Sequence, residues 1–93
     1  MAREAFDRAI DLRPDYAMAL FARGQLKLSE NDAAGAIEDL SAGLLLNPFY
    51  AGGWWNRSVA HGILGKEDAM KADQSRAVEL APDLAKHLEG GMQ

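Results

Sequence analysis

Apolar residues recur every three or four positions along most of this chain, which is the spacing of one face of an α-helix. Short segments that contain proline, glycine, asparagine or aspartate interrupt this spacing. β-Branched residues are scarce, which also favours helix over strand. The pattern therefore predicts an all-α fold, with helices over residues 2–12, 16–29, 33–46, 50–64 and 67–80 and a shorter one over 83–89.

Particular residues mark the expected helix ends. We expect Asp15 to cap the start of the helix over 16–29 and Asp32 to cap the next helix, since an aspartate side chain accepts hydrogen bonds from free N–H groups. Asn31 and Gly65 are suited to the left-handed backbone conformation that follows a helix. Each helix over 2–80 is thus bounded by a recognisable turn.

The helical pattern repeats along the chain. Pro14, Pro48 and Pro82 lie 34 residues apart, and each follows a similar apolar phrase. The segments Leu20–Gly24 and Trp54–Ser58 also correspond at this interval. A fixed period of this length is typical of a solenoid.

The period and its punctuation resemble the tetratricopeptide repeat, a unit of two antiparallel helices. Small residues occupy the packing positions of that pattern, among them Gly24 and Ser58, and Trp54 occupies its tryptophan position. Lys27 and His61 depart from the pattern, because the family often has tyrosine there. The resemblance implies a single domain over 1–93 that forms a right-handed superhelix of helix pairs. It divides into a half repeat over 2–14, full repeats over 15–48 and 49–82, a capping helix over 83–89 and a loose tail over 90–93.

In this family the first helix of each repeat lines the inner wall of the superhelix, and partners bind there. Adjacent helical residues point about 100° apart, so we expect Trp54 in the core and Trp55 on the wall. The resemblance also places Ala22, Leu28, Ser29 and Gly52 on the wall. The expected partner-binding groove consists of Met18, Phe21, Gln25, Trp55, Asn56, Val59 and Ile63.

Aromatic side chains bury a large apolar area at small entropic cost, and asparagine can pair with a peptide backbone. The function indicated is recognition of an unidentified protein or peptide. One alternative is self-association, as a homodimer through the unpaired helix over 2–12. Another is that the chain is a fragment of a longer repeat scaffold. A minor alternative is a carboxylate clamp for a chaperone C-terminal tail. Asn56 and Lys86 hold two of its five positions, and the other three read Phe21, Gln25 and Gly90.

Composition narrows these functions further. The net charge of −4 disfavours nucleic acid and anionic membranes as partners, and no apolar run is long enough to span a bilayer. There is no cysteine, and the two histidines lack metal-ligand spacing. We therefore expect no enzyme activity, no catalytic residue, no metal and no cofactor. The chain carries no secretion signal, so its location is unknown, and cytoplasmic by default.

Two arginines occupy one repeat position. Arg23 and Arg57 lie 34 residues apart, with acids such as Glu38, Asp39 and Asp73 within reach on the following helices. We expect exposed ion pairs, which contribute only about 0–1 kcal/mol each. On that basis these arginines would adjust the stacking of the repeats rather than bind a partner.

Overall fold

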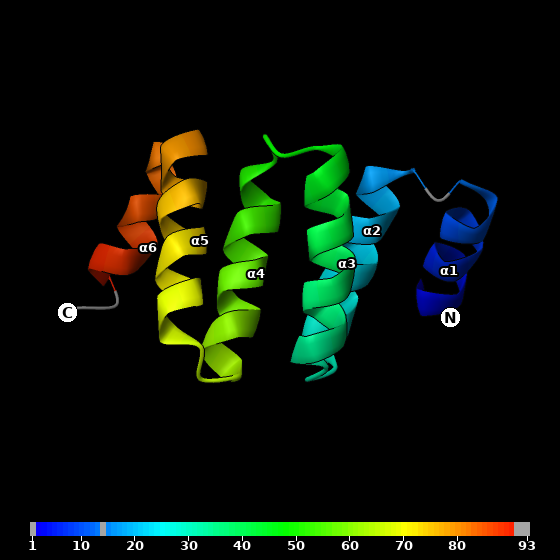
Figure 1. Ribbon diagram of the computed structural model, residues 1–93, viewed down its shortest axis with the longest axis horizontal. Helices are drawn as coiled ribbons and strands as arrows, with labels where there is room; N and C mark the ends of the chain where they lie inside the picture. The colour runs from blue at the N-terminus through cyan, green and yellow to red at the C-terminus, as the bar shows by residue number, and fades with distance from the viewer. Residues whose placement is uncertain (1, 14, 91–93) are drawn as a thin grey trace.

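The computed structural model describes residues 2–13 and 15–90, with residues 2 and 88–90 described by their backbone alone. The described residues form helices and turns and contain no strand, which confirms the all-α fold. The helices are α1 (Ala2–Leu12), α2 (Ala17–Ser29), α3 (Ala33–Leu46), α4 (Ala51–Ile63), α5 (Glu67–Leu80), the 3-10 turn η1 (Pro82–Leu84) and α6 (Ala85–Gly90) (Figure 1).

Consecutive helices run up and down and form a row along the long axis of the molecule, whose extents are 43 × 25 × 20 Å (Figure 1). The most extensive contacts join α2 to α3 and α4 to α5, so each of these pairs is a helical hairpin. The two hairpins meet mainly through α3 and α4, and α2 also contacts α4. Helix α1 packs on α2. This is the stacking that the repeated sequence predicts.

Turn chemistry accounts for several of the helix ends. The Asp32 side chain accepts a hydrogen bond of 3.0 Å from the Gly35 N–H, so its predicted cap is confirmed. Asn31 and Gly65 have φ of +66° and +76°, as predicted for these turns. The predicted cap at Asp15 is wrong. Helix α2 begins at Ala17, its N-cap position is Tyr16, and no side chain caps it.

Small residues allow the helices of a hairpin to approach closely. A Cβ atom at Gly24 would lie 2.8 Å from Leu40 Cγ, so only glycine leaves room for the leucine there. Leu40 and Ala36 are fully buried, and Ala60 and Ala77 are buried to the same degree in the second hairpin. Trp54 packs against this core, as predicted, and its Nε1–H donates a hydrogen bond of 2.8 Å to the Pro48 carbonyl.

Phe21 also belongs to the core, which corrects the expectation that it lines the groove. Its side chain is only 4% exposed. The ring lies between two glycines: a Cβ atom at either Gly43 or Gly53 would come within 2.7 Å of Phe21 Cε1. The ring also contacts Tyr50, with centroids 4.7 Å apart. Because Gly43 and Gly53 have no side chain, the Phe21 ring fits between α3 and α4. It is therefore buried and cannot contact a bound partner.

The capping segment differs slightly from its expected range. The expected helix over 83–89 is instead the turn η1 followed by α6, because Pro82 initiates a 3-10 turn at its first position. Gly90 closes α6, and the rest of the predicted loose tail lies outside the described residues.

Candidate partner-binding groove

The remaining predicted groove residues lie on α2 and α4, the first helices of the two hairpins. Their inward sides are buried through residues such as Leu20 and Ala60. On other sides of the same helices, the Met18, Val59 and Ile63 side chains are 52%, 39% and 54% exposed. Gln25 is exposed, and Trp55 and Asn56 are half-buried. Apart from Phe21, every predicted groove residue thus retains some access to solvent.

Trp55 lies next to the C-terminal helix. Its ring centroid is 5.8 Å from that of His87 on α6, with the planes tilted by 49°. Helix α6 therefore covers part of the indole and leaves the rest accessible. The sequence pattern did not identify His87 as a neighbour of Trp55, because it indicates only a capping role for α6.

A hollow of about 340 Å³ lies between α1 and α2. The sequence pattern did not reveal the contribution of Phe6 to this hollow. The residue one repeat later is Leu40, which the first helix of its own hairpin buries completely, whereas no described helix covers Phe6 in that way. This comparison of equivalent positions is the signal that could have identified Phe6. The hollow is lined by Phe6, Ala22, Gln25, Leu26 and Ser29.

The two residues of the proposed carboxylate clamp lie on different helices. Asn56 is half-buried on α4, and Lys86 is exposed on α6. Phe21, at a third clamp position, is buried and cannot present a side chain to a carboxylate. Within residues 2–13 and 15–90, no group of three or more His, Asp or Glu side chains is arranged to hold a metal ion.

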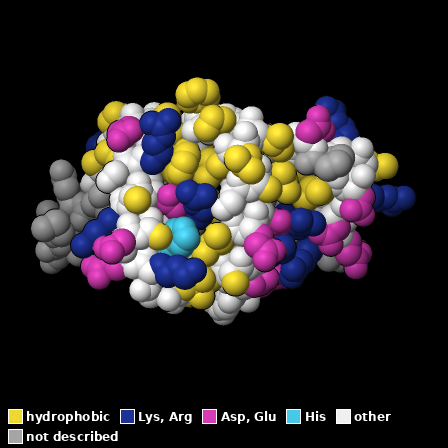
Figure 2. All heavy atoms as spheres, viewed as in Figure 1, with side chains coloured by type: hydrophobic (Ala, Val, Ile, Leu, Met, Phe, Trp, Pro, Cys, Tyr) yellow, Lys and Arg dark blue, Asp and Glu magenta, His cyan; other side chains and the backbone are white. Residues whose placement is uncertain are grey.

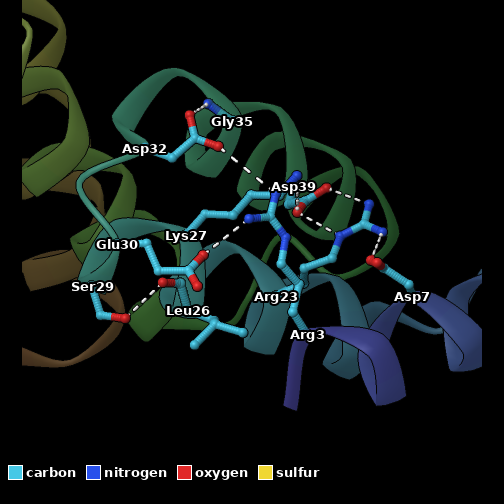
Figure 3. Close-up of polar contacts among 10 residues, drawn as sticks. All are labelled: Arg3, Asp7, Arg23, Leu26, Lys27, Ser29, Glu30, Asp32, Gly35 and Asp39. Carbon is cyan, nitrogen blue, oxygen red and sulfur yellow. Dashed lines mark hydrogen bonds and ion pairs between the residues drawn. The ribbon is translucent and has the colours of Figure 1, made fainter. Parts of the chain in front are cut away.

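A cluster of charged side chains lies inside the first hairpin (Figure 3). The Arg23 guanidinium donates two hydrogen bonds of 2.8 Å to the Asp39 carboxylate and one of 2.7 Å to Asp7 on α1. The Lys27 ammonium lies 2.9 Å from the same Asp39 carboxylate. Burial by itself raises the pKa of Asp39, but the hydrogen bonds from Arg23 and Lys27 outweigh it and hold the pKa below its ordinary value.

The second hairpin repeats this arrangement. The Arg57 guanidinium donates hydrogen bonds of 2.7 and 2.9 Å to Asp73 and one of 3.1 Å to the Ser41 hydroxyl on α3. His61 replaces Lys27, with Nε2 3.4 Å from the Asp73 carboxylate. Burial lowers the pKa of His61, and the charges of Arg57 and Lys66 add to this effect against the opposing charge of Asp73.

These contacts confirm that the two arginines pair with Asp39 and Asp73, but the expectation of exposed pairs is wrong. Both aspartates are only 5% exposed, because each carboxylate faces the interior of its hairpin. Lys27 and His61, which replace tyrosines of the repeat pattern, complete the two clusters. The charged residues therefore build the scaffold and do not line the groove.

Comparisons with known proteins agree with this architecture. Residues 51–84 match the family profile described as tetratricopeptide repeat. Tetratricopeptide repeat protein 36 of Bos taurus is 33% identical over 89 residues, which are 91% of this chain and 47% of that protein. Protein O-mannosyl-transferase TMTC3 of Homo sapiens is 34% identical over 82 residues, which are 87% of this chain and 9% of that protein. The chain thus spans less than half the length of these relatives.

Two solved structures have the same fold. MamA superimposes with a TM-score of 0.81 at 25% identity, over 90% of this chain and 49% of that chain. The first tetratricopeptide repeat domain of Spaghetti (RPAP3), bound to the HSP90 peptide SRMEEVD, gives a TM-score of 0.84 at 21% identity. That match covers 98% of this chain and 78% of the other, and at this identity it shows the fold alone.

The repeated hairpins define a helical-repeat protein whose class generally serves protein–protein interaction. This chain contains tetratricopeptide repeats and has the fold of that family. Its described helices include none that is both long and apolar enough to cross a bilayer.

Proposed function

We propose that this chain binds an extended segment of a partner protein along α2 and α4. The observation that carries the proposal is the exposure of Met18, Val59 and Ile63 on helices whose inward sides are fully packed. The fold does not need these side chains for its core. Apolar side chains that stay exposed beside polar neighbours are suited to a site that another protein covers.

The side chains on these helices are chemically suited to a peptide. Methionine adapts to irregular apolar partners, and the exposed part of the Trp55 indole offers a large area at small entropic cost. Gln25 and Asn56 each supply a hydrogen-bond donor and an acceptor, which the backbone of an extended guest needs when it leaves water. The proposed groove consists of Met18, Gln25, Trp55, Asn56, Val59 and Ile63, together with the hollow beside Phe6.

A peptide library tests this proposal even though the partner is unidentified. Linear peptides selected on the wild-type chain from a display library are labelled, and their affinities are measured by fluorescence anisotropy. Met18→Glu and Ile63→Glu place a charge on the wall at positions that are already half exposed, so the fold should persist. We expect each variant to weaken binding at least tenfold, which corresponds to about 1.4 kcal/mol.

Leu12→Glu is the control, because Leu12 is an apolar residue on α1 that is exposed, at 76%, and lies outside the proposed groove. It should bind the selected peptides like the wild type. Circular dichroism checks that all three variants remain helical. Unchanged binding by both Met18→Glu and Ile63→Glu would contradict the proposed groove. Loss of binding in Leu12→Glu alone would place the binding site on α1 instead.

Recognition of a terminal carboxylate is a second, narrower candidate. It rests on Asn56 and Lys86, and the peptide SRMEEVD in the Spaghetti complex provides a suitable probe. We compare this peptide with its C-terminally amidated form. If Asn56 and Lys86 act as a clamp, amidation should weaken binding to the wild type but not to Lys86→Ala. Equal affinities of both peptides for the wild type would rule out the clamp.

A further inference from the structure

The connection between α3 and α4 presents an apolar surface that the groove does not use. Four of its side chains are accessible: Leu45 is 87% exposed, Leu46 47%, Phe49 73% and Tyr50 38%. We call these four residues the α3–α4 patch. Figure 2 shows hydrophobic side chains gathered at the upper edge of the molecule, where Figure 1 places the end of α3 and the start of α4. Leu45 and Phe49 are the most exposed members of the patch.

A hollow of about 550 Å³ adjoins the patch. The Trp54 indole forms part of its wall, and the Arg57 guanidinium lies over that ring, 4.9 Å from its centroid. Leu45 belongs to both the patch and the hollow, and Phe49 follows Pro48 of its lining directly. The surface thus combines projecting apolar side chains with a recess that can receive one. The hollow is lined by Ser41, Leu44, Leu45, Pro48, Trp54 and Arg57.

The other repeats show that the fold does not require apolar residues at the positions of Leu45 and Phe49. The residues 34 positions before and after Leu45 are Asp11 and Glu79, and those equivalent to Phe49 are Asp15 and Asp83. All four acids are exposed, as are Leu45 and Phe49. The same backbone positions therefore carry carboxylates in both neighbouring repeats. Apolar residues at exposed positions that tolerate an acid indicate a surface that another molecule covers.

The distribution of charge favours a second copy of this chain as that molecule. The chain has a net charge of −4, so two copies repel each other over most orientations. From Leu40 to Asn56, however, there is no charged residue. Contact between two copies through this segment therefore brings no charged residue of the segment against its equivalent in the other copy. A two-fold axis requires a self-complementary surface, which the projecting Phe49 and the adjoining hollow provide.

We propose that the α3–α4 patch is the contact between two copies of this chain, related by a two-fold axis, with Phe49 of each copy seated in the hollow of the other. The patch exposes on the order of 500 Å² of apolar surface, given that one aromatic side chain covers about 150–250 Å². A standard interface buries about 800 Å² per partner. The dimer is therefore weak and depends on concentration. None of the groove residues belongs to the patch or lines its hollow, so this test and the peptide assay probe different side chains.

Sedimentation equilibrium tests the proposal over chain concentrations from about 1 µM to about 1 mM, where interfaces of this size associate. The weight-average mass of the wild type should rise from 10.1 kDa towards twice that value. The double variant Leu45→Glu, Phe49→Asp installs residues that the equivalent positions of the chain already carry, so it should fold and remain monomeric. The control Leu12→Glu should associate like the wild type.

Two results would overturn the proposal. A wild-type chain that stays monomeric throughout the series would leave the patch to a different protein or to a lipid surface. Association that persists in the double variant, or that disappears in Leu12→Glu alone, would assign the contact to another surface such as α1.

Chemical cross-linking gives a second measurement that does not depend on the double variant. The chain has no cysteine, so a single introduced thiol is the only target of a short bismaleimide. Leu46→Cys lies in the patch and leaves Leu45 and Phe49 in place, whereas Leu12→Cys lies at the equivalent position one repeat earlier. We expect a covalent dimer for Leu46→Cys at concentrations that yield none for Leu12→Cys. Equal yields would show random collision and contradict the proposal.

Discussion

Each hairpin holds one arginine against one buried aspartate, and the arginine also reaches the helix before its own hairpin. Arg23 binds Asp39 and contacts Asp7 on α1, while Arg57 binds Asp73 and contacts Ser41 on α3. Asp7 and Ser41 lie one repeat apart, so the two arginines make equivalent contacts. Each one therefore fixes both the pairing within a hairpin and its attachment to the preceding helix.

Removal of Asp73 should destabilise the chain strongly. The Asp73→Ala variant leaves the half-buried Arg57 guanidinium without its main acceptor, and breaking a buried pair in this way typically costs about 3–5 kcal/mol. We expect a loss near the lower end, about 3 kcal/mol, because Arg57 remains 21% exposed and can recover some water. Urea denaturation measures this free energy of unfolding.

Glu79→Ala provides the control for Asp73→Ala. Glu79 pairs with Arg76 at 3.0 Å on the surface of α5. The loss of an exposed pair of this kind should amount to less than about 1 kcal/mol. Equal losses in the two variants would show that the Arg57–Asp73 pair is no stronger than an exposed one.

His61 should make the stability of the fold depend on pH. Its pKa in the folded chain is lowered from 6.5, chiefly by burial, and Nδ1 is buried without a partner among the described residues. The unfolded chain therefore binds the proton more tightly than the folded chain. Stability is fully present above pH 6.5 and should decline as the pH falls below that value towards the lower pKa of the folded state.

Thermal unfolding between pH 7.5 and pH 5 measures this decline as a decrease in Tm. The His61→Gln variant keeps a side-chain N–H that can face Asp73 but does not titrate, so its decline over this range should be smaller. His87→Gln removes the other histidine and should behave like the wild type. If the profiles of His61→Gln and the wild type coincide, His61 does not control this dependence.

At the scale of helices, sequence could predict an end wherever a residue with special backbone or capping chemistry marks it. Asn31, Asp32 and Gly65 mark such ends, and α3 and α5 have the predicted bounds. The start of α2 has no comparable marker, because no side chain caps it. The cap predicted at Asp15 rested on residue type alone, and Asp15 lies one residue before the N-cap position. A helix end can thus be predicted from sequence where a capping or left-handed residue defines it, and not where the helix begins without one.

The groove could be predicted only in part, for a different physical reason. The repeat pattern treats each helix position as equivalent from one repeat to the next, so it predicts the same environment for Phe21 and Trp55. Their surroundings differ. Phe21 is enclosed by Gly43 of α3 and Gly53 of α4, whereas Trp55 lies beside α6. Burial of Phe21 depends on how three consecutive helices pack together, and the pattern of a single helix does not contain that information.

Gly53→Ala should therefore destabilise the chain. The added Cβ atom would lie 2.7 Å from the Phe21 ring and 2.9 Å from Leu44 Cδ2, both of which are tightly packed. Overpacking of a core costs about 1–3 kcal/mol, against a gain of up to about 1 kcal/mol in helix propensity. We expect a net loss of about 1 kcal/mol in the free energy of unfolding, measured by urea denaturation.

Gly62→Ala is the matched control, in the same helix. Its Cβ atom would meet only the flexible Met70 side chain, at 3.0 Å, and the position is exposed. The propensity gain should dominate there and stabilise the chain by about 0.5–1 kcal/mol. If both alanines stabilise the chain, the core around Phe21 has more free space than its contacts indicate.

At the scale of the whole molecule, α1 is attached differently from the two hairpins. Each of the helices α2 to α5 contributes buried residues, whereas none of residues 3–12 is buried. Three ion pairs supplement its packing: Asp7 with Arg23 at 2.7 Å, and Arg3 with Glu30 at 3.0 Å and with Asp32 at 4.0 Å. Local stability should therefore be lower at α1 than where the hairpins meet.

Amide hydrogen exchange should reveal this gradient directly. Amides of α1 should exchange through local opening, well before those of α2, α3 and α4, which require opening of the shared core around Phe21 and Leu40. Salt provides the control. Raising the ionic strength to about 1 M shortens the screening length to about 3 Å and weakens exposed ion pairs. It should accelerate exchange in α1 and leave the core amides nearly unchanged. Uniform protection of α1 and α3, insensitive to salt, would mean that α1 unfolds only together with the hairpins.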